Sequence, residues 1–175
     1  MKTNITLIGM PGAGKSTTGI ILAKYLSYDF VDTDILIQIN QQKSLQAIIN
    51  ESDYLHLRKI EEDEILKLNV DNHVVATGGS AVYSRKAMAH LRNISVIVFL
   101  RVAYGTVCSR IRNFNERGIS KPEHQSFLDL YDERQSLYKQ YADLIIDADS
   151  LDQESIALSL LNTMKDNGML ATLGT

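Results

Sequence analysis

The chain of 175 residues has one cysteine, two prolines and no tryptophan, and it contains no long apolar run. The lone Cys108 cannot form an internal disulfide. No apolar run approaches the roughly 20 residues that cross a bilayer, and no secretory signal precedes the first apolar segment. A basic excess is missing too, since the formal net charge is −3. We therefore expect a cytoplasmic protein with neither a membrane nor a nucleic acid as partner.

What is present is typical of one globular α/β domain, with 45% hydrophobic and 22% charged residues. Apolar runs of strand length alternate with helical patterns, which indicates a parallel sheet flanked by helices. The expected strands are Ile5–Ile8, Phe30–Asp32, Val74–Ala76, Ile94–Leu100 and Leu144–Ile146. The expected helices run from about 15 to 27, 84 to 92, 102 to 113, 125 to 141 and 153 to 165, besides a helical block described below.

One motif carries most of the functional information. The residues from Gly9 to Ser16 fit G-x-x-x-x-G-K-[ST], directly after an apolar run and before an amphipathic helical pattern. Its glycines let the backbone turn tightly and aim N–H groups at phosphates, to which the following helix adds the positive end of its dipole. Lys15 can reach the outer phosphates, and the Ser16 hydroxyl can bind the accompanying Mg²⁺. The motif therefore predicts a nucleotide site.

Two segments interrupt the alternation of strands and helices within the single domain expected over 1–175. The helical block from about 33 to 68 is too long for a simple crossover, so we expect a substrate-binding insertion there. Most of its charges between Arg58 and Glu64 are expected to be solvated. The polar segment from about 112 to 124 holds Gly118 and Pro122 between two helices, which is typical of a lid.

Two carboxylates, Asp32 and Asp34, follow the second expected strand, at the sheet edge where parallel sheets bind ligands. If the strand geometry persists, residues two apart point the same way, with one near the metal and one further out. The alternative is that both acids simply mark a helix N-terminus, where negative charge is favourable.

Taken together with further motifs, these residues resemble the shikimate kinase family over nearly the whole length of the chain. The resemblance rests on an ordered set: the Gly9–Ser16 motif, Phe30-Val-Asp-Thr-Asp34, Leu57-Arg58-Lys-Ile-Glu61, Ala76-Thr-Gly-Gly79, Arg110, Arg117 and Glu133-Arg134-x-x-Leu-Tyr138. It implies the five-stranded parallel sheet of nucleoside monophosphate kinases. It also implies ATP-dependent phosphorylation of the 3-hydroxyl of shikimate, on the route to aromatic amino acids.

The resemblance implies roles for individual residues. Those for catalysis are Lys15, Asp34 and Arg117. Those for ATP are Gly12, Ala13, Gly14, Lys15, Ser16, Thr17, Arg110 and Arg117, and those for Mg²⁺ are Ser16 and Asp32. Those for shikimate are Asp34, Arg58, Gly78, Gly79 and Arg134. Asp34 would hold the acceptor hydroxyl and take its proton.

The two substrate arginines are the best guide to substrate class. Taken alone, Arg58 or Arg134 is more typical of a weak surface ion pair. Together, on two separate segments, they favour a carboxylate ligand, because the guanidinium fork matches a carboxylate. We expect a monomer that binds ATP and a small hydroxylated acid.

Four positions depart from the family pattern: Ser80 replaces a glycine, Leu57 an aromatic residue, and Gly118 and Ser136 each replace a proline. Ser80 adds a side chain beside the expected substrate pocket, and a glycine after Arg117 predicts a looser lid. Three hypotheses remain: a shikimate kinase, a related kinase for gluconate or a nucleoside monophosphate, or an ATP-binding regulatory protein without turnover.

Overall fold

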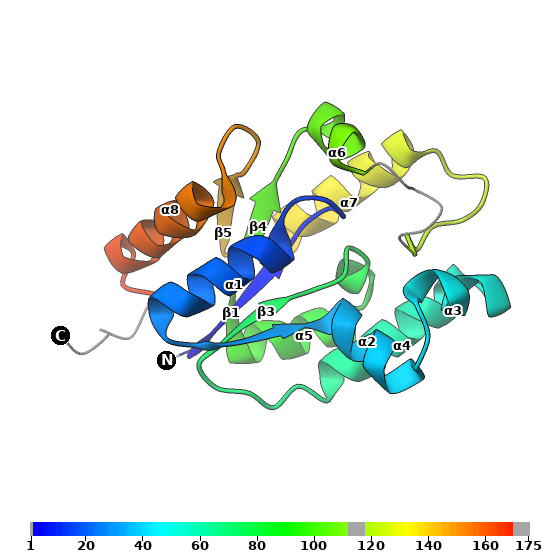
Figure 1. Ribbon diagram of the computed structural model, residues 1–175, viewed down its shortest axis with the longest axis horizontal. Helices are drawn as coiled ribbons and strands as arrows, with labels where there is room; N and C mark the ends of the chain where they lie inside the picture. The colour runs from blue at the N-terminus through cyan, green and yellow to red at the C-terminus, as the bar shows by residue number, and fades with distance from the viewer. Residues whose placement is uncertain (1, 112–117, 170–175) are drawn as a thin grey trace.

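The computed structural model describes residues 2–111 and 118–169 (Figure 1). Its centre is one five-stranded sheet in the order β2-β3-β1-β4-β5, with every adjacent pair parallel. The strands are β1 (Asn4–Ile8), β2 (Asp29–Asp32), β3 (His73–Ala76), β4 (Ser95–Arg101) and β5 (Leu144–Asp147). The prediction of an α/β fold with a five-stranded parallel sheet is confirmed.

Helices cover both faces of the sheet, as buried parallel strands require. In Figure 1, α1 (Lys15–Leu26) and α8 (Gln153–Asp166) lie side by side on one face, and α5 (Arg85–Ile94) and α7 (Phe127–Tyr141) lie on the other. The short helices η1 (Ala81–Tyr83) and α6 (Tyr104–Arg110) follow β3 and β4. Among the described residues, no helix combines the length and apolar character of a membrane span.

The helical block between β2 and β3 is three helices: α2 (Thr33–Gln41), α3 (Leu45–Glu51) and α4 (Tyr54–Leu66). They form a small core of their own around Ile37, Ile48, Leu57 and Ile60. Side-chain caps from Ser44 and Asp53 start α3 and α4, which explains the two breaks in the block. In Figure 1 this group lies beyond the end of β2, beside the chain that leads into α7.

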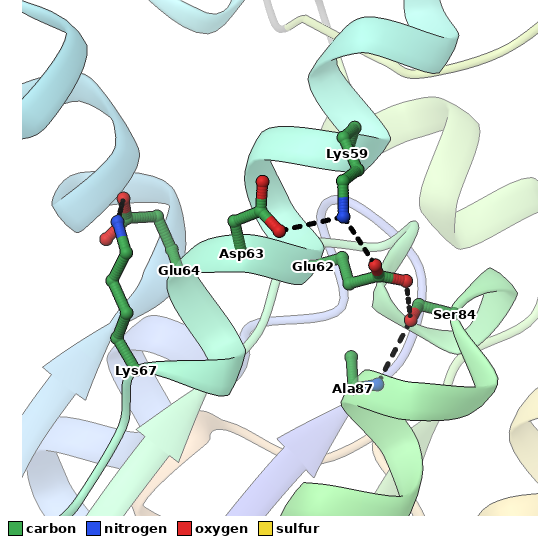
Figure 2. Close-up of polar contacts among 7 residues, drawn as sticks. All are labelled: Lys59, Glu62, Asp63, Glu64, Lys67, Ser84 and Ala87. Atoms are coloured by element: carbon green, nitrogen blue, oxygen red, sulfur yellow. Dashed lines mark hydrogen bonds and ion pairs between the residues drawn. The ribbon is translucent and has the colours of Figure 1, made fainter.

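The charges on α4 fall on two different faces. Lys59 forms ion pairs with Glu62 and Asp63 on the outer side, as Figure 2 shows. Glu61 and Glu64 instead are only 3% and 5% exposed, so the prediction that this stretch is mostly solvated is wrong for both. The sequence did contain a signal, because the two acids continue the helical apolar stripe formed by Leu57, Ile60, Ile65 and Leu68.

Candidate functional site

A cavity of about 350 Å³ opens where β1 and β3 end, at the edge of a parallel sheet that typically binds ligands. Its wall is built from the loop before α1 and the start of that helix, from α2, α3 and α4, from the loop after β3, from residues 118–120, and from Arg110 and Arg134. The sequence-predicted site residues in this wall are Gly12, Gly14, Lys15, Ser16, Thr17, Asp34, Gly78, Gly79, Arg110 and Arg134. The fold therefore brings the expected nucleotide and substrate residues into one space.

The loop before α1 has the backbone that a phosphate cradle needs. Gly9, Gly12 and Gly14 all have positive φ angles, of 146°, 80° and 94°. Helix α1 starts at Lys15 without a side-chain cap, so its first N–H groups are available to an anion. Ala13 differs from its neighbours, because its methyl group is buried and its N–H donates to the Met10 carbonyl at 3.1 Å.

Lys15 places a buried cation at this loop. Its Nζ donates to the carbonyl oxygens of Gly9 at 2.9 Å and Met10 at 3.0 Å. Burial lowers the pKa of Lys15 to about 8, against the opposing pull of Asp34 and Asp32. The amine is thus held by the loop itself, where the charges of Asp34 and Asp32 favour its protonated form.

Ser16 and Asp32, the expected metal pair, are in direct contact. Ser16 Oγ donates to Asp32 Oδ2 at 2.5 Å, and Asp32 Oδ1 accepts from the backbone N–H of Asp34 at 2.9 Å. A hydroxyl and a carboxylate are hard oxygen donors of the kind that Mg²⁺ prefers, and Mg²⁺ usually takes its other ligands from phosphates and water.

The strand argument for Asp34 was wrong. Asp32 is both the last residue of β2 and the N-cap of α2, so Asp34 already lies in the first helical turn. The alternative of an acidic helix N-terminus therefore describes the local structure, and the first turn of α2 is what directs Asp34 into the cavity.

The carboxylate of Asp34 lies near that of the buried Glu61 at Gly78. A Cβ atom on Gly78 would collide with Asp34 Oδ1 and with Glu61 Oε1, which explains the glycine. Burial and then the charge of Asp32 raise the pKa of Asp34 to about 6. Burial and then the charge of Asp34 raise the pKa of Glu61 to about 7. Glu61 was not among the site residues predicted from the sequence.

Glu61 makes the stability of the protein depend on pH. The folded chain keeps the Glu61 proton up to about pH 7, whereas an unfolded chain loses it near the ordinary value of 4.5. The folded state therefore binds more protons in this interval, and the free energy of unfolding falls as pH rises through it. We expect Glu61→Gln to lose less stability than the wild type between about pH 5 and about pH 8, measured by urea unfolding. Asp63→Asn, at an exposed acid of the same helix, should show the same pH dependence of stability as the wild type. If Glu61→Gln also showed the wild-type pH dependence, the prediction would be contradicted.

Arg58 and Arg134, the two arginines expected at the substrate, both donate hydrogen bonds to Ser120. Arg134 is buried, and its Nη2 donates to the Ser120 carbonyl at 2.7 Å. Arg58 Nε donates to Ser120 Oγ at 3.0 Å, and Arg58 Cζ lies 3.6 Å from the centre of the Tyr83 ring. Ser120 lines the cavity, whereas Arg58 does not. Gly79 adjoins them, since a Cβ there would lie 2.8 Å from Arg134 Nη1. Sequence analysis missed Tyr83 and Ser120, because nothing in their local sequence marks them.

Two arginines were expected at the nucleotide. Arg110 ends α6 beside Gly12 and lines the cavity, and its Nη1 is buried without a hydrogen-bond partner among the described residues. Arg117 lies outside the described residues, as do residues 112–116 of the expected lid.

Gly118 packs against the start of α3. Its φ is +61°, its N–H donates to Gln46 Oε1 at 3.1 Å, and a Cβ on it would collide with Leu45. A proline, usual here in the family pattern, would fit neither the positive φ nor the N–H bond. The contact joins the expected lid to the expected substrate insertion.

We expect Gly118→Ala to lower the free energy of unfolding by at least about 1–2 kcal/mol, because a Cβ is disfavoured at this φ and meets Leu45. Gly118→Pro should cost more. Gly105→Ala in α6 is the matched control, since a Cβ there meets nothing within 4 Å. Urea unfolding of the variants checks this, and equal stability of Gly118→Ala and Gly105→Ala would contradict it.

Known proteins agree with this geometry. The family model described as shikimate kinase matches residues 11–165. A shikimate kinase from Thermosynechococcus vestitus is 37% identical over 144 residues, which cover 81% of this chain and 78% of the relative. One from a Sulfurihydrogenibium species is 31% identical over 163 residues, covering 93% and 98%.

Solved structures give the same result. A shikimate kinase from Acinetobacter baumannii in complex with shikimate has a TM-score of 0.89 at 25% identity, covering 99% of this chain and 97% of its own. A deoxyadenosine kinase from M. mycoides, at 15% identity and a TM-score of 0.56, shares only the fold. Since the family model spans most of the chain and curated relatives above 30% identity cover more than two thirds of it, this chain belongs to the shikimate kinase family.

Proposed function

We propose that the protein transfers the γ-phosphate of ATP to the 3-hydroxyl of shikimate, giving shikimate 3-phosphate. The observation that carries this is one cavity lined both by the phosphate cradle with Lys15 and by Asp34 and Arg134. The neighbour from A. baumannii was solved with shikimate bound. Phosphoryl transfer asks mainly that donor and acceptor be aligned and that charge on the oxygens be held, and these residues supply both.

On the donor side, the N–H groups at the start of α1 would bind the phosphates, and Lys15 would leave its carbonyl partners to hold their outer oxygens. Ser16 and Asp32 would hold Mg²⁺, which neutralises charge on the phosphate oxygens. Arg110 would contact the adenine, a role supported by its place at the cavity wall next to Gly12. Arg117 would reach the phosphates from the lid, as the family resemblance implies.

On the acceptor side, Arg134 and Arg58 would bind the substrate carboxylate, since both already donate to the same carbonyl at Ser120. Asp34 would orient the acceptor hydroxyl and take its proton. Gly78 and Gly79 would let the substrate approach the backbone. We further infer a monomer in which residues 1–175 form one kinase unit, with the insertion at 33–68 and the lid at 112–124.

The test is an assay of the purified protein with Mg²⁺ and ATP against shikimate, gluconate and nucleoside monophosphates in parallel. We expect turnover with shikimate alone, detected as ADP and as shikimate 3-phosphate. Turnover with another acceptor in preference to shikimate would overturn the proposal. So would ATP binding without turnover on any of them, the behaviour of a regulatory protein.

A further inference from the structure

Glu61 is a charged group in the cavity to which the proposed reaction assigns no task. Its carboxylate is buried, and it lines the cavity together with Asp34 and Gly78. Ser80 Oγ donates a short hydrogen bond to Glu61 Oε2, whereas Oε1 has no hydrogen-bond partner among the described residues. A buried acceptor without a donor is costly, so a site of this kind normally meets a donor that the protein itself does not supply.

The backbone of Glu61 is held from outside the cavity. Figure 2 shows how Glu62, the next residue of α4, accepts from Ser84 Oγ, which in turn accepts from the N–H of Ala87 as the N-cap of α5. The backbone of Ser80 is held as well, because its carbonyl accepts from the N–H of Tyr83 at 3.0 Å. With both backbones in place, the Ser80 hydroxyl decides how the Glu61 carboxylate is turned.

The charged groups around Glu61 come from three other elements. Asp34 of α2 repels it, and Lys15 of α1 and Arg134 of α7 attract it. Within the described residues neither cation donates a hydrogen bond to Glu61, whose bonded oxygen is held by Ser80 alone. The direction of the free oxygen therefore depends on Ser80 and not on an ion pair.

The unbonded oxygen of Glu61, Oε1, lies near Asp34, the residue proposed to hold the substrate hydroxyl that is phosphorylated. Glu61 Oε1 and Asp34 Oδ1 both crowd the place where a Cβ on Gly78 would stand. Above about pH 7, where the raised pKa values of Glu61 and Asp34 leave both carboxylates ionised, they only accept hydrogen bonds, so two such oxygens at one point suit a ligand that offers two donors close together. Hydroxyls on adjacent carbons are such donors.

We propose that Ser80 is a positioning residue for substrate recognition. This inference rests on the proposed function. The Ser80 hydroxyl holds Glu61 Oε2, so that Glu61 Oε1 accepts a hydrogen bond from the substrate hydroxyl on the carbon next to the phosphorylated one. Asp34 binds the hydroxyl that is phosphorylated, and Glu61 binds the hydroxyl on the adjacent carbon. A glycine at position 80, the usual family residue, cannot make this bond because it has no side chain.

The test compares the wild type, Ser80→Ala and Ser80→Thr with two acceptors: shikimate, and shikimate lacking the hydroxyl next to the one that is phosphorylated. Ser80→Ala should raise KM for shikimate about tenfold, the typical effect of losing a hydrogen bond to a charged group, and leave KM for ATP unchanged. Ser80→Thr should restore KM, because it keeps the hydroxyl. With the deoxygenated acceptor, the wild type and Ser80→Ala should have the same KM.

Equal KM values of the wild type and Ser80→Ala for shikimate would overturn the inference, as would an equal rise for both acceptors. Ser155→Ala is the matched control, because it removes a serine-to-carboxylate bond, to Asp152 at the start of α8, outside the cavity wall and should leave KM for shikimate unchanged. Thermal unfolding of each variant confirms that it is folded.

Calorimetric titration with shikimate separates this inference from the proposed function. A wild type that binds shikimate but does not phosphorylate it would contradict the proposed function alone. Equal Kd values of the wild type and Ser80→Ala for shikimate would contradict the role of Ser80 alone.

Discussion

Replacing Lys15 by Met is expected to lower kcat for shikimate phosphorylation by about 100- to 1,000-fold, the usual loss when one donor to developing transition-state charge is removed. Lys15 is the cation at the cradle, and its amine is held by two loop carbonyls beside Asp32 and Asp34. Met has a similar length and no charge, so it fills the space without stabilising the transferring phosphate. Steady-state kinetics with saturating Mg²⁺ and ATP measure the effect.

Lys24→Met is the control for this variant, because Lys24 is an exposed lysine in the last turn of the same helix. It should keep the wild-type kcat. Since Lys15 also bonds the loop carbonyls, the melting temperature of Lys15→Met must be measured beside its kinetics. A folded Lys15→Met enzyme with kcat within a few fold of the wild type would contradict the assigned role.

Replacing Arg134 by Ala is expected to raise KM for shikimate at least about 30-fold, because truncating one partner of a buried charged pair costs at least about 2 kcal/mol. Arg134 is 1% exposed, its Nη2 donates to Ser120, and its Nε is buried without a partner among the described residues. This leaves donors to spare for a substrate carboxylate. KM for ATP should remain nearly unchanged, since the cradle is built from other segments.

Arg134→Lys separates charge from shape. It keeps the charge but not the planar fork, so its KM for shikimate should lie between those of the wild type and Arg134→Ala. Arg92→Ala, at an exposed arginine in the last turn of α5, serves as the surface control. An equal loss of ATP and shikimate affinity in folded Arg134→Ala would contradict its assignment to the carboxylate.

The elements of the fold were largely predictable, because their signals are local. Strand β4 is an almost continuous apolar run, and α2 begins directly after an acidic cap. Two local rules competed at Asp34: β2 ends at Asp32 as predicted, but helix capping by Asp32 places Asp34 in the first turn of α2 and not on a continued strand. Ile94 likewise ends α5 and does not start β4.

The site was predictable only in part. The cradle was predicted from residue type and spacing, and Arg58 and Arg134 were expected at the substrate from the family resemblance; the fold brings them to one cavity or to its wall at Ser120. Glu61 was missed although its position on an apolar stripe marked it as buried. The contact of Tyr83 with Arg58 could not have been predicted, because the ring lies 3.6 Å from a guanidinium that is 25 positions away in the sequence.

By itself the sequence determined the phosphate cradle, because its conformation depends on consecutive residues: glycines at positive φ and a helix that starts directly after them. Only the tertiary structure decided the acceptor side. Ser80 meets Glu61 from 19 residues away, and Gly118 meets Gln46 from 72 residues away. Such contacts depend on how helices and loops pack against the sheet, and packing is a property of the folded chain that no local pattern encodes.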